Sequence, residues 1–400
     1  MLECLKKEYT IELLNDGVKI KDIIQYFLEQ NPNEEPFYVV HISNIIHSYQ
    51  KWTKLLPNIQ PYYAVKCNSN TVLLKTLSLL GCNFDCASEN EIKQIMEIVN
   101  DPNRIIFANP CKMKSHLQYA NINNVSLMTF DCEEELYKIK TFYPSAKLII
   151  RIAVDDSNSL CKFSSKFGCG LKEVAHLLVL TKQLGLNIEG VSFHVGSGCM
   201  STTSFYQAIS DCKQVVDIAK EMNINMKIIN IGGGFPGNDK TIQFEDIATS
   251  VRKGINDFFL EDFTNNRIQF IAEPGRYFAQ NSHILVLTIT GKKSIINELG
   301  EKIFIYYVND GLYNSFNCIL FDHATFDLIP LVVREGPQYK SKIFGPTCDS
   351  MDLIKENILL PEYFIGDWFY VEDFGAYTVS PSSGFNGFTT GINKYIITNE

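Results

Sequence analysis

The chain has 400 residues, of which 46% are hydrophobic and 20% are charged, so its composition predicts one large or two linked folded domains and excludes a disordered chain. Acidic residues outnumber basic ones by 45 to 36, the reverse of what a protein bound to the nucleic-acid backbone shows, and we expect no nucleic-acid partner. No stretch of about 18 uncharged apolar residues occurs, so we expect a soluble, cytoplasmic protein with no membrane partner.

Eight short runs of strand-forming residues recur between residues 60 and 275, and segments with apolar residues at three- and four-residue spacing separate them. Eight strands that alternate with helices predict an α/β fold, a (β/α)8 barrel. The runs are PYYAVK (61–66), CNFDCA (82–87), RIIFANP (104–110), SLMTFD (126–131), KLIIRIAV (147–154), EGVSFHVG (189–196), KIINIGGG (227–234) and IQFIAEPG (268–275).

The pattern changes after about residue 280, where strand-like runs follow one another without long helices. These runs predict a second, all-β domain. The run FYVVH (37–41) would be a ninth strand in a barrel that needs eight, so about the first forty residues are expected to join the β domain. The predicted domains are residues 38–279 for the barrel and residues 1–37 with 280–400 for the β domain. The four runs are ILVLTITGKK, KIFIYYVND, LIPLVV and WFYVEDFGAYT.

Polar residues stand at the ends of most predicted barrel strands. In (β/α)8 barrels the chemistry lies at the carboxyl ends of the strands. Any one such residue could instead be a helix cap or a solvated rim residue, but their convergence on one face indicates a functional site. They are Lys66, Asp85, Asp131, Arg151, His194 and Glu273.

The loops after the seventh and eighth predicted strands carry Gly232–Gly234 and Gly275-Arg276. Two tight turns would use the same residues, but these two loops often hold a phosphate in such barrels. Glycine lets the backbone approach an anion closely, and arginine donates charge-assisted hydrogen bonds. These loops therefore predict a phosphate site.

Lys66 ends the first predicted strand beside the apolar Ala64 and Val65. A lysine at that place is either a misplaced charge or an amine that forms a Schiff base. A reactive amine together with a phosphate site indicates pyridoxal 5'-phosphate as the cofactor. Glu273 then fits as the carboxylate partner of the pyridine nitrogen.

Three other sequence patterns do not change this interpretation. The run GGGFPG (232–237) matches a dinucleotide-binding fingerprint, but it follows the seventh strand and contains Pro236, so a nicotinamide oxidoreductase is a distant alternative. Ser88-x-x-Glu91 is a capping box at the start of a helix. The seven histidines and twelve cysteines lack the spacing of metal sites, and we assign no metal.

The chain resembles the eukaryotic ornithine decarboxylases in eight motifs that occur in order between about residues 35 and 390: PYYAVKCN, FDCAS, GVSFHVGSG, NIGGGFPG, AEPGRYF, YYVNDGLYNSFNCILFDHA, GPTCDSMD and EDFGAYT. The resemblance implies an alanine-racemase-like fold and pyridoxal-phosphate-dependent conversion of L-ornithine to putrescine and CO2, the entry step of polyamine biosynthesis. It also implies a head-to-tail homodimer whose active sites are shared across the interface, and it leaves antizyme open as a partner.

The resemblance assigns a role to each residue of the site. Lys66 would hold the cofactor covalently, His194 would stack on its ring and Glu273 would pair with its pyridine nitrogen. From the partner subunit, Cys348 would deliver a proton, and Asp349 would bind the distal amine of ornithine together with Asp322 of the first subunit. The other implied cofactor contacts are Asp85, Arg151, Ser197, Gly233, Gly234, Arg276 and Tyr377, and Lys166 and Asp352 match positions that form an ion pair across the dimer.

Two alternatives to ornithine decarboxylation stay open at this point. Arginine, lysine or diaminopimelate could be the substrate, and Phe321, which stands where the family usually has tyrosine, bears on substrate affinity. A catalytically inactive regulator of the antizyme-inhibitor kind is the other alternative. Such proteins lose cofactor contacts or the proton donor, whereas Lys66, Arg276 and Cys348 are present here.

Overall fold

A computed structural model describes residues 2–30 and 33–398, which divide into two compact units. One unit is the continuous segment 46–278. The other is made of the segments before and after it, residues up to 45 and from 279. Among the described residues, no helix combines the length and apolar character that a membrane span requires. No group of three or more His, Cys, Asp or Glu side chains in that part of the chain is arranged to hold a metal.

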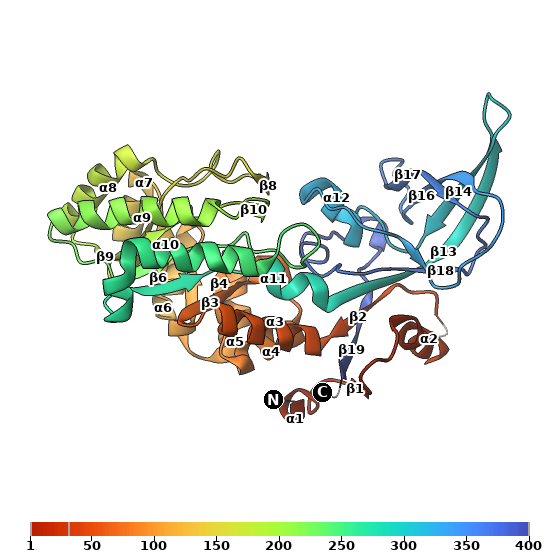
Figure 1. The fold of residues 1–400 in the computed structure, drawn as a ribbon, viewed down its shortest axis with the longest axis horizontal. Helices are drawn as coiled ribbons and strands as arrows, with labels where there is room; N and C mark the ends of the chain where they lie inside the picture. The colour runs from red at the N-terminus through yellow and green to blue at the C-terminus, as the bar shows by residue number, and fades with distance from the viewer. Residues whose placement is uncertain (1, 31–32, 399–400) are drawn as a thin grey trace. The chain divides into compact units, whose positions relative to one another are not determined.

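Residues 46–278 form a closed eight-stranded barrel with the order β11-β12-β3-β4-β5-β6-β7-β9, and all its strand pairs are parallel. The predicted (β/α)8 barrel is therefore confirmed, and each of the eight predicted runs supplies one strand (Figure 1). The strands are β3 (Ile59–Ala64), β4 (Asn83–Cys86), β5 (Ile105–Phe107), β6 (Leu127–Phe130), β7 (Lys147–Arg151), β9 (Asn187–Ser192), β11 (Ile228–Asn230) and β12 (Gln269–Ala272).

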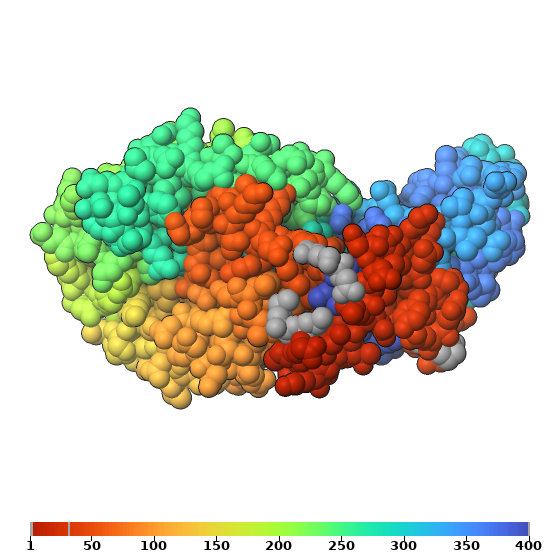
Figure 2. Space-filling model, turned by 60° about the horizontal axis from the view of Figure 1, so that its bottom comes forward, coloured from red at the N-terminus to blue at the C-terminus, as the bar shows by residue number. Residues whose placement is uncertain are grey.

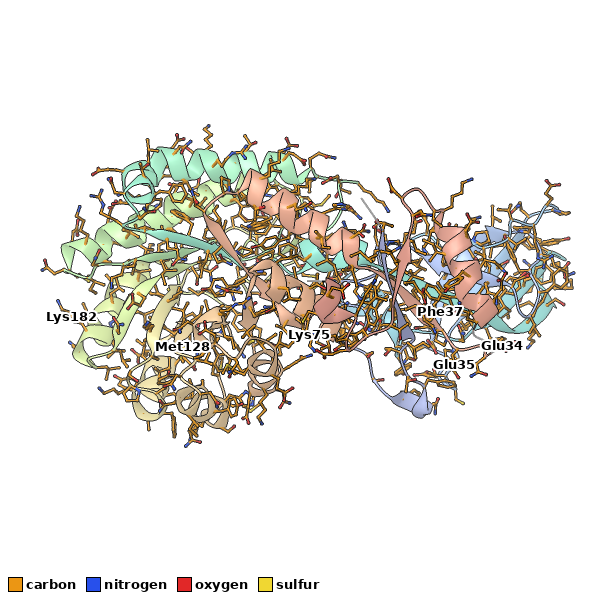
Figure 3. All side chains as sticks on the ribbon, turned by 90° about the horizontal axis from the view of Figure 1, so that it is seen from below. Glu34, Glu35, Phe37, Lys75, Met128 and Lys182 are labelled. Atoms are coloured by element: carbon orange, nitrogen blue, oxygen red, sulfur yellow. The ribbon has the colours of Figure 1, made fainter. Side chains whose placement is uncertain are left out.

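Helices surround the barrel strands (Figure 1). Apolar side chains from both layers fill the space between them, and Met128 of β6 is fully buried there (Figure 3). The buried Trp52 of α3 stacks on Phe244 of α10 with ring centroids 5.6 Å apart. On the face shown in Figure 2, the orange part of the chain that includes α3 lies against the green part that includes α10. The helices are α3 (Ile42–Leu55), α4 (Thr71–Leu80), α5 (Glu89–Val99), α6 (Lys114–Ile122), α7 (Glu133–Phe142), α8 (Leu171–Gln183), α9 (Ser204–Glu221), α10 (Phe244–Thr264) and α11 (Arg276–Ala279).

Helix α5 begins with the capping box predicted from the sequence. Ser88 Oγ accepts a hydrogen bond from the backbone N–H of Glu91 at 3.3 Å. The Glu91 carboxylate turns back and accepts from the backbone N–H of Ala87 at 2.6 Å, one residue before the cap. The backbone N–H groups of Glu91 and Ala87 both have partners in this way, which fixes where the helix after β4 begins.

The other unit, residues up to 45 and from 279, is called the sheet unit below. It contains a nine-stranded mixed sheet with the path β1-β19-β2-β13-β14-β16-β17, in which β18 pairs with β13 and β15. The run FYVVH is strand β2, which lies in this sheet between β13 and β19. Phe37 of β2 packs against Phe27 of helix α2 (Ile20–Gln30) with ring centroids 6.3 Å apart (Figure 3). The strands are β1 (Ile11–Leu14), β2 (Phe37–His41), β13 (His283–Ile296), β14 (Lys302–Val308), β15 (Ile329–Pro330), β16 (Tyr339–Phe344), β17 (Leu353–Leu360), β18 (Trp368–Val371) and β19 (Ile392–Thr398).

Short elements complete the two units. A two-stranded antiparallel sheet of β8 (Ser159–Cys161) and β10 (Ser197–Cys199) lies outside the barrel ring. The sheet unit carries the short helices α1 (Leu2–Leu5) and α12 (Cys318–Phe321). This small sheet matters for function because Ser197 is the first residue of β10.

Candidate active site

Lys66 lies just beyond β3 and not within it. The strand ends at Ala64, and Lys66 belongs to the 3-10 turn Val65–Cys67 with its side chain 41% exposed. The amine is therefore not enclosed by its apolar neighbours, which differs from the expectation. Its Nζ donates to Oδ2 of Asp85, whose carboxylate is buried on β4. Oδ1 of Asp85 has no hydrogen-bond partner among the described residues, so this carboxylate can accept from a bound group.

Glu273 follows β12 and is 8% exposed. Its Oε1 accepts a hydrogen bond from Asn230 Nδ2 at 2.6 Å. Burial, and after it the Asp85 charge, raise the pKa of Glu273 from 4.5 to about 7, a net shift that Lys66, Asn230 and Arg151 oppose. A carboxyl group with this pKa is partly ionised near neutral pH, and a protonated pyridine nitrogen placed beside it would favour the ionised form.

Arg151 and His194 lie at the ends of two neighbouring barrel strands, with Arg151 at the end of β7 and His194 two residues after β9. Arg151 is the last residue of β7, and burial lowers the pKa of its guanidinium. Burial also lowers the pKa of His194 far below its usual value, and the Arg151 and Lys66 charges add to this. The backbone N–H of Gly196 donates to His194 Nδ1 at 3.0 Å, and Phe163 packs against the ring edge-on with centroids 5.0 Å apart. The imidazole is therefore neutral and held in place, as a stacking surface must be.

The glycine loop after β11 passes very close to its neighbours. A Cβ atom on Gly233 would lie 2.7 Å from the carbonyl oxygen of Glu273 and 2.8 Å from His194 Nε2. A Cβ on Gly234 would lie 2.6 Å from the carbonyl oxygen of Gly196, and the φ of Gly234 is +103°. Only glycine fits at these positions, because any side chain would collide with the backbone opposite. The loop can therefore present its backbone directly to an anion.

Ser197 and Arg276 meet beside this loop. Arg276 Nη2 donates to Ser197 Oγ at 3.0 Å, and Ser197 follows Gly196, the residue that Gly234 approaches. A hydroxyl, a guanidinium and a glycine backbone together provide the donors that a phosphate binds. These residues fit the phosphate of pyridoxal 5'-phosphate, and Lys66, Asp85 and Glu273 fit its other end.

The sheet unit contains the other residues that the resemblance assigned to the site. Cys348 is exposed on the loop between β16 and β17, and its backbone N–H donates to Asn386 Oδ1 at 2.9 Å. Asp349 accepts from the Met351 backbone N–H at 3.0 Å and from the Tyr313 hydroxyl, and both hydrogen bonds lower the pKa of Asp349. Asp322 is 6% exposed after α12, and Tyr377 has a φ of +55° after β18.

Two other carboxylates singled out in the sequence accept hydrogen bonds within their own unit. Asp352 is fully buried in its own unit, where its carboxylate accepts from Leu312 N–H at 2.7 Å and from the hydroxyl of Thr347 at 2.7 Å. The ion pair of Asp352 with Lys166 across a dimer stays a prediction. Asp131 accepts from the backbone N–H of Gly168 at 2.8 Å, which gives it a part in holding a loop.

Comparison with known proteins identifies the family. Residues 42–280 match the family model described as "Pyridoxal-dependent decarboxylase, pyridoxal binding domain". The chain belongs to the pyridoxal-dependent decarboxylases. It is 42% identical to mouse ornithine decarboxylase over 399 residues, which cover 96% of this chain and 86% of that protein. The expected cofactor, pyridoxal 5'-phosphate, is confirmed by this membership.

Other members of the family bear on the alternatives. Antizyme inhibitor 2 of Xenopus laevis is 40% identical over 397 residues, 96% of this chain and 86% of that protein. The solved arginine decarboxylase of Paramecium bursaria Chlorella virus, bound to agmatine, superposes with a TM-score of 0.88 at 35% identity and covers 94% of this chain and 100% of that one. Pyridoxal-dependent decarboxylases thus share this fold while their named substrates differ.

Sequence reasoning about this decarboxylase missed Asn230 and Phe163. Asn230 is the last residue of β11 and contacts Glu273, so the rule that polar residues at strand ends form the site would have found it. Phe163 contacts His194 from the loop after β8, and no sequence pattern connects the two.

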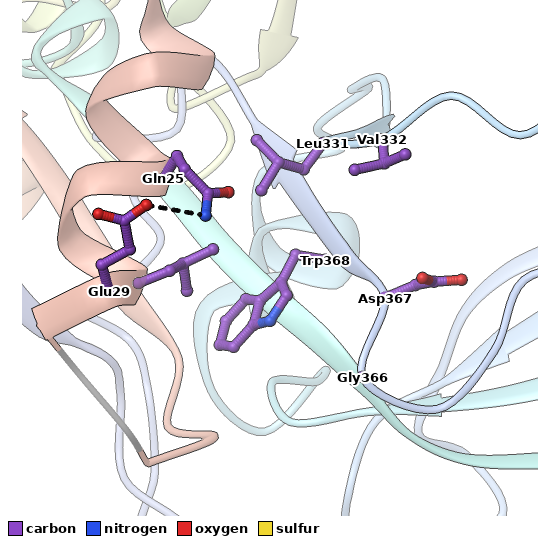
Figure 4. A pocket seen from close by; sticks show the side chains of 8 residues that line it. Gln25, Glu29, Leu331, Val332, Gly366, Asp367 and Trp368 are labelled. Atoms are coloured by element: carbon purple, nitrogen blue, oxygen red, sulfur yellow. Dashed lines mark hydrogen bonds between the residues drawn. The ribbon is translucent and has the colours of Figure 1, made fainter.

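A separate hollow of about 270 Å³ lies on the sheet unit of this decarboxylase (Figure 4). Leu28 and Glu29 of α2 face Leu331, Val332 and Trp368 across it, and Gln25 donates to Glu29 on its rim (Figure 4). None of the residues that line it belongs to the predicted site.

Proposed function

We propose that this chain decarboxylates L-ornithine to putrescine and CO2 with pyridoxal 5'-phosphate held at the barrel mouth. The observation that carries this proposal is the pairing of Lys66 with Asp85 and of Glu273 with Asn230 in a family of pyridoxal-dependent decarboxylases. The bound cofactor supplies an electron-withdrawing ring that accepts the electron pair left when the carboxylate departs as CO2.

Each barrel residue then has a task. The amine of Lys66 would hold the cofactor through its aldehyde group, and Asp85 orients that amine. Glu273 carries the negative charge that keeps the pyridine nitrogen protonated, while Arg151 supports the buried carboxylate. His194 provides a neutral flat surface for the ring. Ser197, Gly233, Gly234 and Arg276 would bind the phosphate. The family resemblance adds Tyr377 to this set.

The sheet unit supplies the groups that act on the substrate. We propose a homodimer in which Cys348 of the partner subunit gives its Sγ proton to the carbon that has lost CO2. Asp322 and the partner subunit's Asp349 bind the distal ammonium, which needs a counter-charge in a partly dry site. The hydrogen bonds that lower the pKa of Asp349 keep it ionised for this task. A reducing, cytoplasmic location fits the twelve free cysteines.

Relative rates on basic amino acids test the substrate assignment. We expect kcat/KM for L-ornithine to exceed that for L-arginine and L-lysine by about a hundredfold, because a misplaced cation leaves a buried carboxylate such as Asp322 without its counter-charge. Release of labelled CO2 from each substrate measures this. A preference for arginine or lysine would overturn the substrate, and no release from any of them, with no cofactor bound, would favour the inactive regulator.

Replacement of Glu273 by alanine should lower kcat more than it raises KM for ornithine. The Glu273 charge interacts most strongly with the pyridine nitrogen when negative charge reaches the ring, so its loss affects the transition state more than substrate binding. Steady-state rates, corrected for bound cofactor, measure the two constants. Glu261→Ala, on the exposed surface of α10, is the control. A change in KM alone would contradict this role.

A further inference from the structure

Asn230 connects two parts of the proposed cofactor site. It is the last residue of β11, and its side chain is fully buried. Its Oδ1 accepts from the backbone N–H of Gly232 at 2.9 Å, and its Nδ2 donates to Glu273 Oε1 at 2.6 Å. One side chain therefore contacts both the first turn of the glycine loop and the carboxylate opposite the pyridine nitrogen.

The neighbours of Asn230 determine which way its amide faces. The N–H of Gly232 can only donate, so the amide oxygen must lie on that side. The amide NH2 group then faces Glu273, whose carboxylate accepts when it is ionised. The backbone of the glycine loop thus orients the donor that Glu273 receives.

We propose that Asn230 is a positioning residue that holds the Glu273 carboxylate, in its orientation and ionised form, against the pyridine nitrogen while it fixes the start of the glycine loop. This inference rests on the proposed function. It assigns to Asn230 no contact with the substrate, and its effect passes through Glu273.

The charges around Glu273 explain why an amide suits this place. Burial and Asp85 of β4 disfavour the ionised carboxylate, whereas Lys66 of the turn after β3, Arg151 of β7 and Asn230 favour it. Of the three side chains that favour the ionised form of Glu273, only Asn230 is uncharged. It donates a hydrogen bond without adding a charge to the buried site, whereas an aspartate there would place a second carboxylate against the first.

The variant Asn230→Asp isolates the contact with Glu273, because its carboxylate still accepts from Gly232 but no longer donates when ionised. Two adjacent buried carboxylates share a proton, so their folded-state pKa lies above the unfolded value. The folded chain then binds more protons than the unfolded chain, and stability falls as pH rises. We expect the melting temperature of the cofactor-free full-length variant to fall below that of the wild type by an amount that grows from pH 5 to pH 8. A constant difference would overturn the proposal.

A second variant separates positioning from packing. Asn230→Asp combined with Glu273→Gln restores one hydrogen bond with donor and acceptor exchanged, so the pH-dependent loss of stability should disappear. The negative charge then lies on residue 230 and no longer on residue 273, which would face the pyridine nitrogen. We therefore expect kcat to stay about 10- to 100-fold below the wild-type value and KM for ornithine to stay within about twofold of the wild-type value. Recovery of both stability and kcat would show that the location of the charge does not matter, and the proposal would be wrong.

Asn83→Asp is the matched control. Asn83 lies at the opposite, amino end of a barrel strand and accepts from Arg104 at 3.3 Å, so a carboxylate is compatible there. The difference between its melting temperature and that of the wild type should stay constant from pH 5 to pH 8, because a carboxylate beside Arg104 is already ionised at pH 5, and its kcat should be unchanged. A wild-type chain that binds no pyridoxal phosphate would refute the proposed function. A wild type that binds it and turns over ornithine, beside an Asn230→Asp variant with unchanged kcat and pH profile, would refute this inference alone.

Discussion

Replacement of Lys66 by alanine should lower kcat by about a thousandfold or more, because the chain loses the amine that binds the cofactor covalently. Borohydride reduction followed by mass spectrometry of the peptides provides a second measurement. In the wild type the reduced cofactor should remain on the peptide that contains Lys66, and in Lys66→Ala no peptide should carry it. Near-native turnover in this variant would refute the assignment of the lysine.

Two further lysine variants show whether turnover depends on the positive charge of Lys66 or on its nucleophilic amine. Lys66→Arg keeps a cation beside the buried Asp85 but cannot bind an aldehyde, so it should be as inactive as the alanine variant while it folds normally. Lys93→Ala removes a surface lysine that pairs with Glu89 on α5, and its kcat should match the wild type. Activity in Lys66→Arg would mean that the positive charge alone is needed.

Mixing inactive Lys66→Ala with inactive Cys348→Ala should restore roughly a quarter of the activity of the same amount of wild-type protein. If each site takes Lys66 from one subunit and Cys348 from the other, a mixed dimer carries both lesions in one site and keeps the second site intact. Random exchange makes half of the dimers mixed, each with one of two sites complete. Turnover is measured after exchange, which native mass spectrometry of differently tagged chains confirms.

The double variant Lys66→Ala/Cys348→Ala should lower the activity of the wild type with which it exchanges subunits, if the sites are shared. When it exchanges with an equal amount of wild type, every mixed dimer has one lesion in each site, so activity should fall to about half of its value before mixing. Sites confined to single subunits would leave that activity unchanged and would give no rescue in the first mixture. That pair of results would refute the shared site.

The barrel could be predicted because its signal is periodic and local. Each strand is a short buried run, and a helix with one apolar face follows it, so eight repeats defined both the strands and the edge where the site lies. The position of Lys66 could not be predicted to the residue, since β3 stops at Ala64 and a 3-10 turn, not a strand, presents the amine. The contact between Asn230 and Glu273 joins residues 43 apart in the chain, and only the closed barrel brings them together.

The strands of the sheet unit were harder to predict from the sequence. The run LIPLVV looks like a six-residue strand, but β15 contains only Ile329 and Pro330, because the exposed Val332 and Val333 have no neighbouring strand. Strand β16 reads YKSKIF, and its alternation of polar and apolar residues is broken by Ser341, a polar residue at a buried position. Short or half-exposed strands such as these depend on partners that are distant in sequence.

The mixed sheet has a consequence for the order in which the protein is made. Strand β2 pairs with β13 and β19, so residues 37–41 emerge from the ribosome long before either of their partners at 283–286 and 392–396. The barrel is one continuous segment and can close while β19 is still untranslated. Strand β1 pairs with β19 as well, so the last strand to be synthesised joins two of the first. Nascent chains that are stalled before residue 392 should therefore carry a closed barrel and an incomplete sheet.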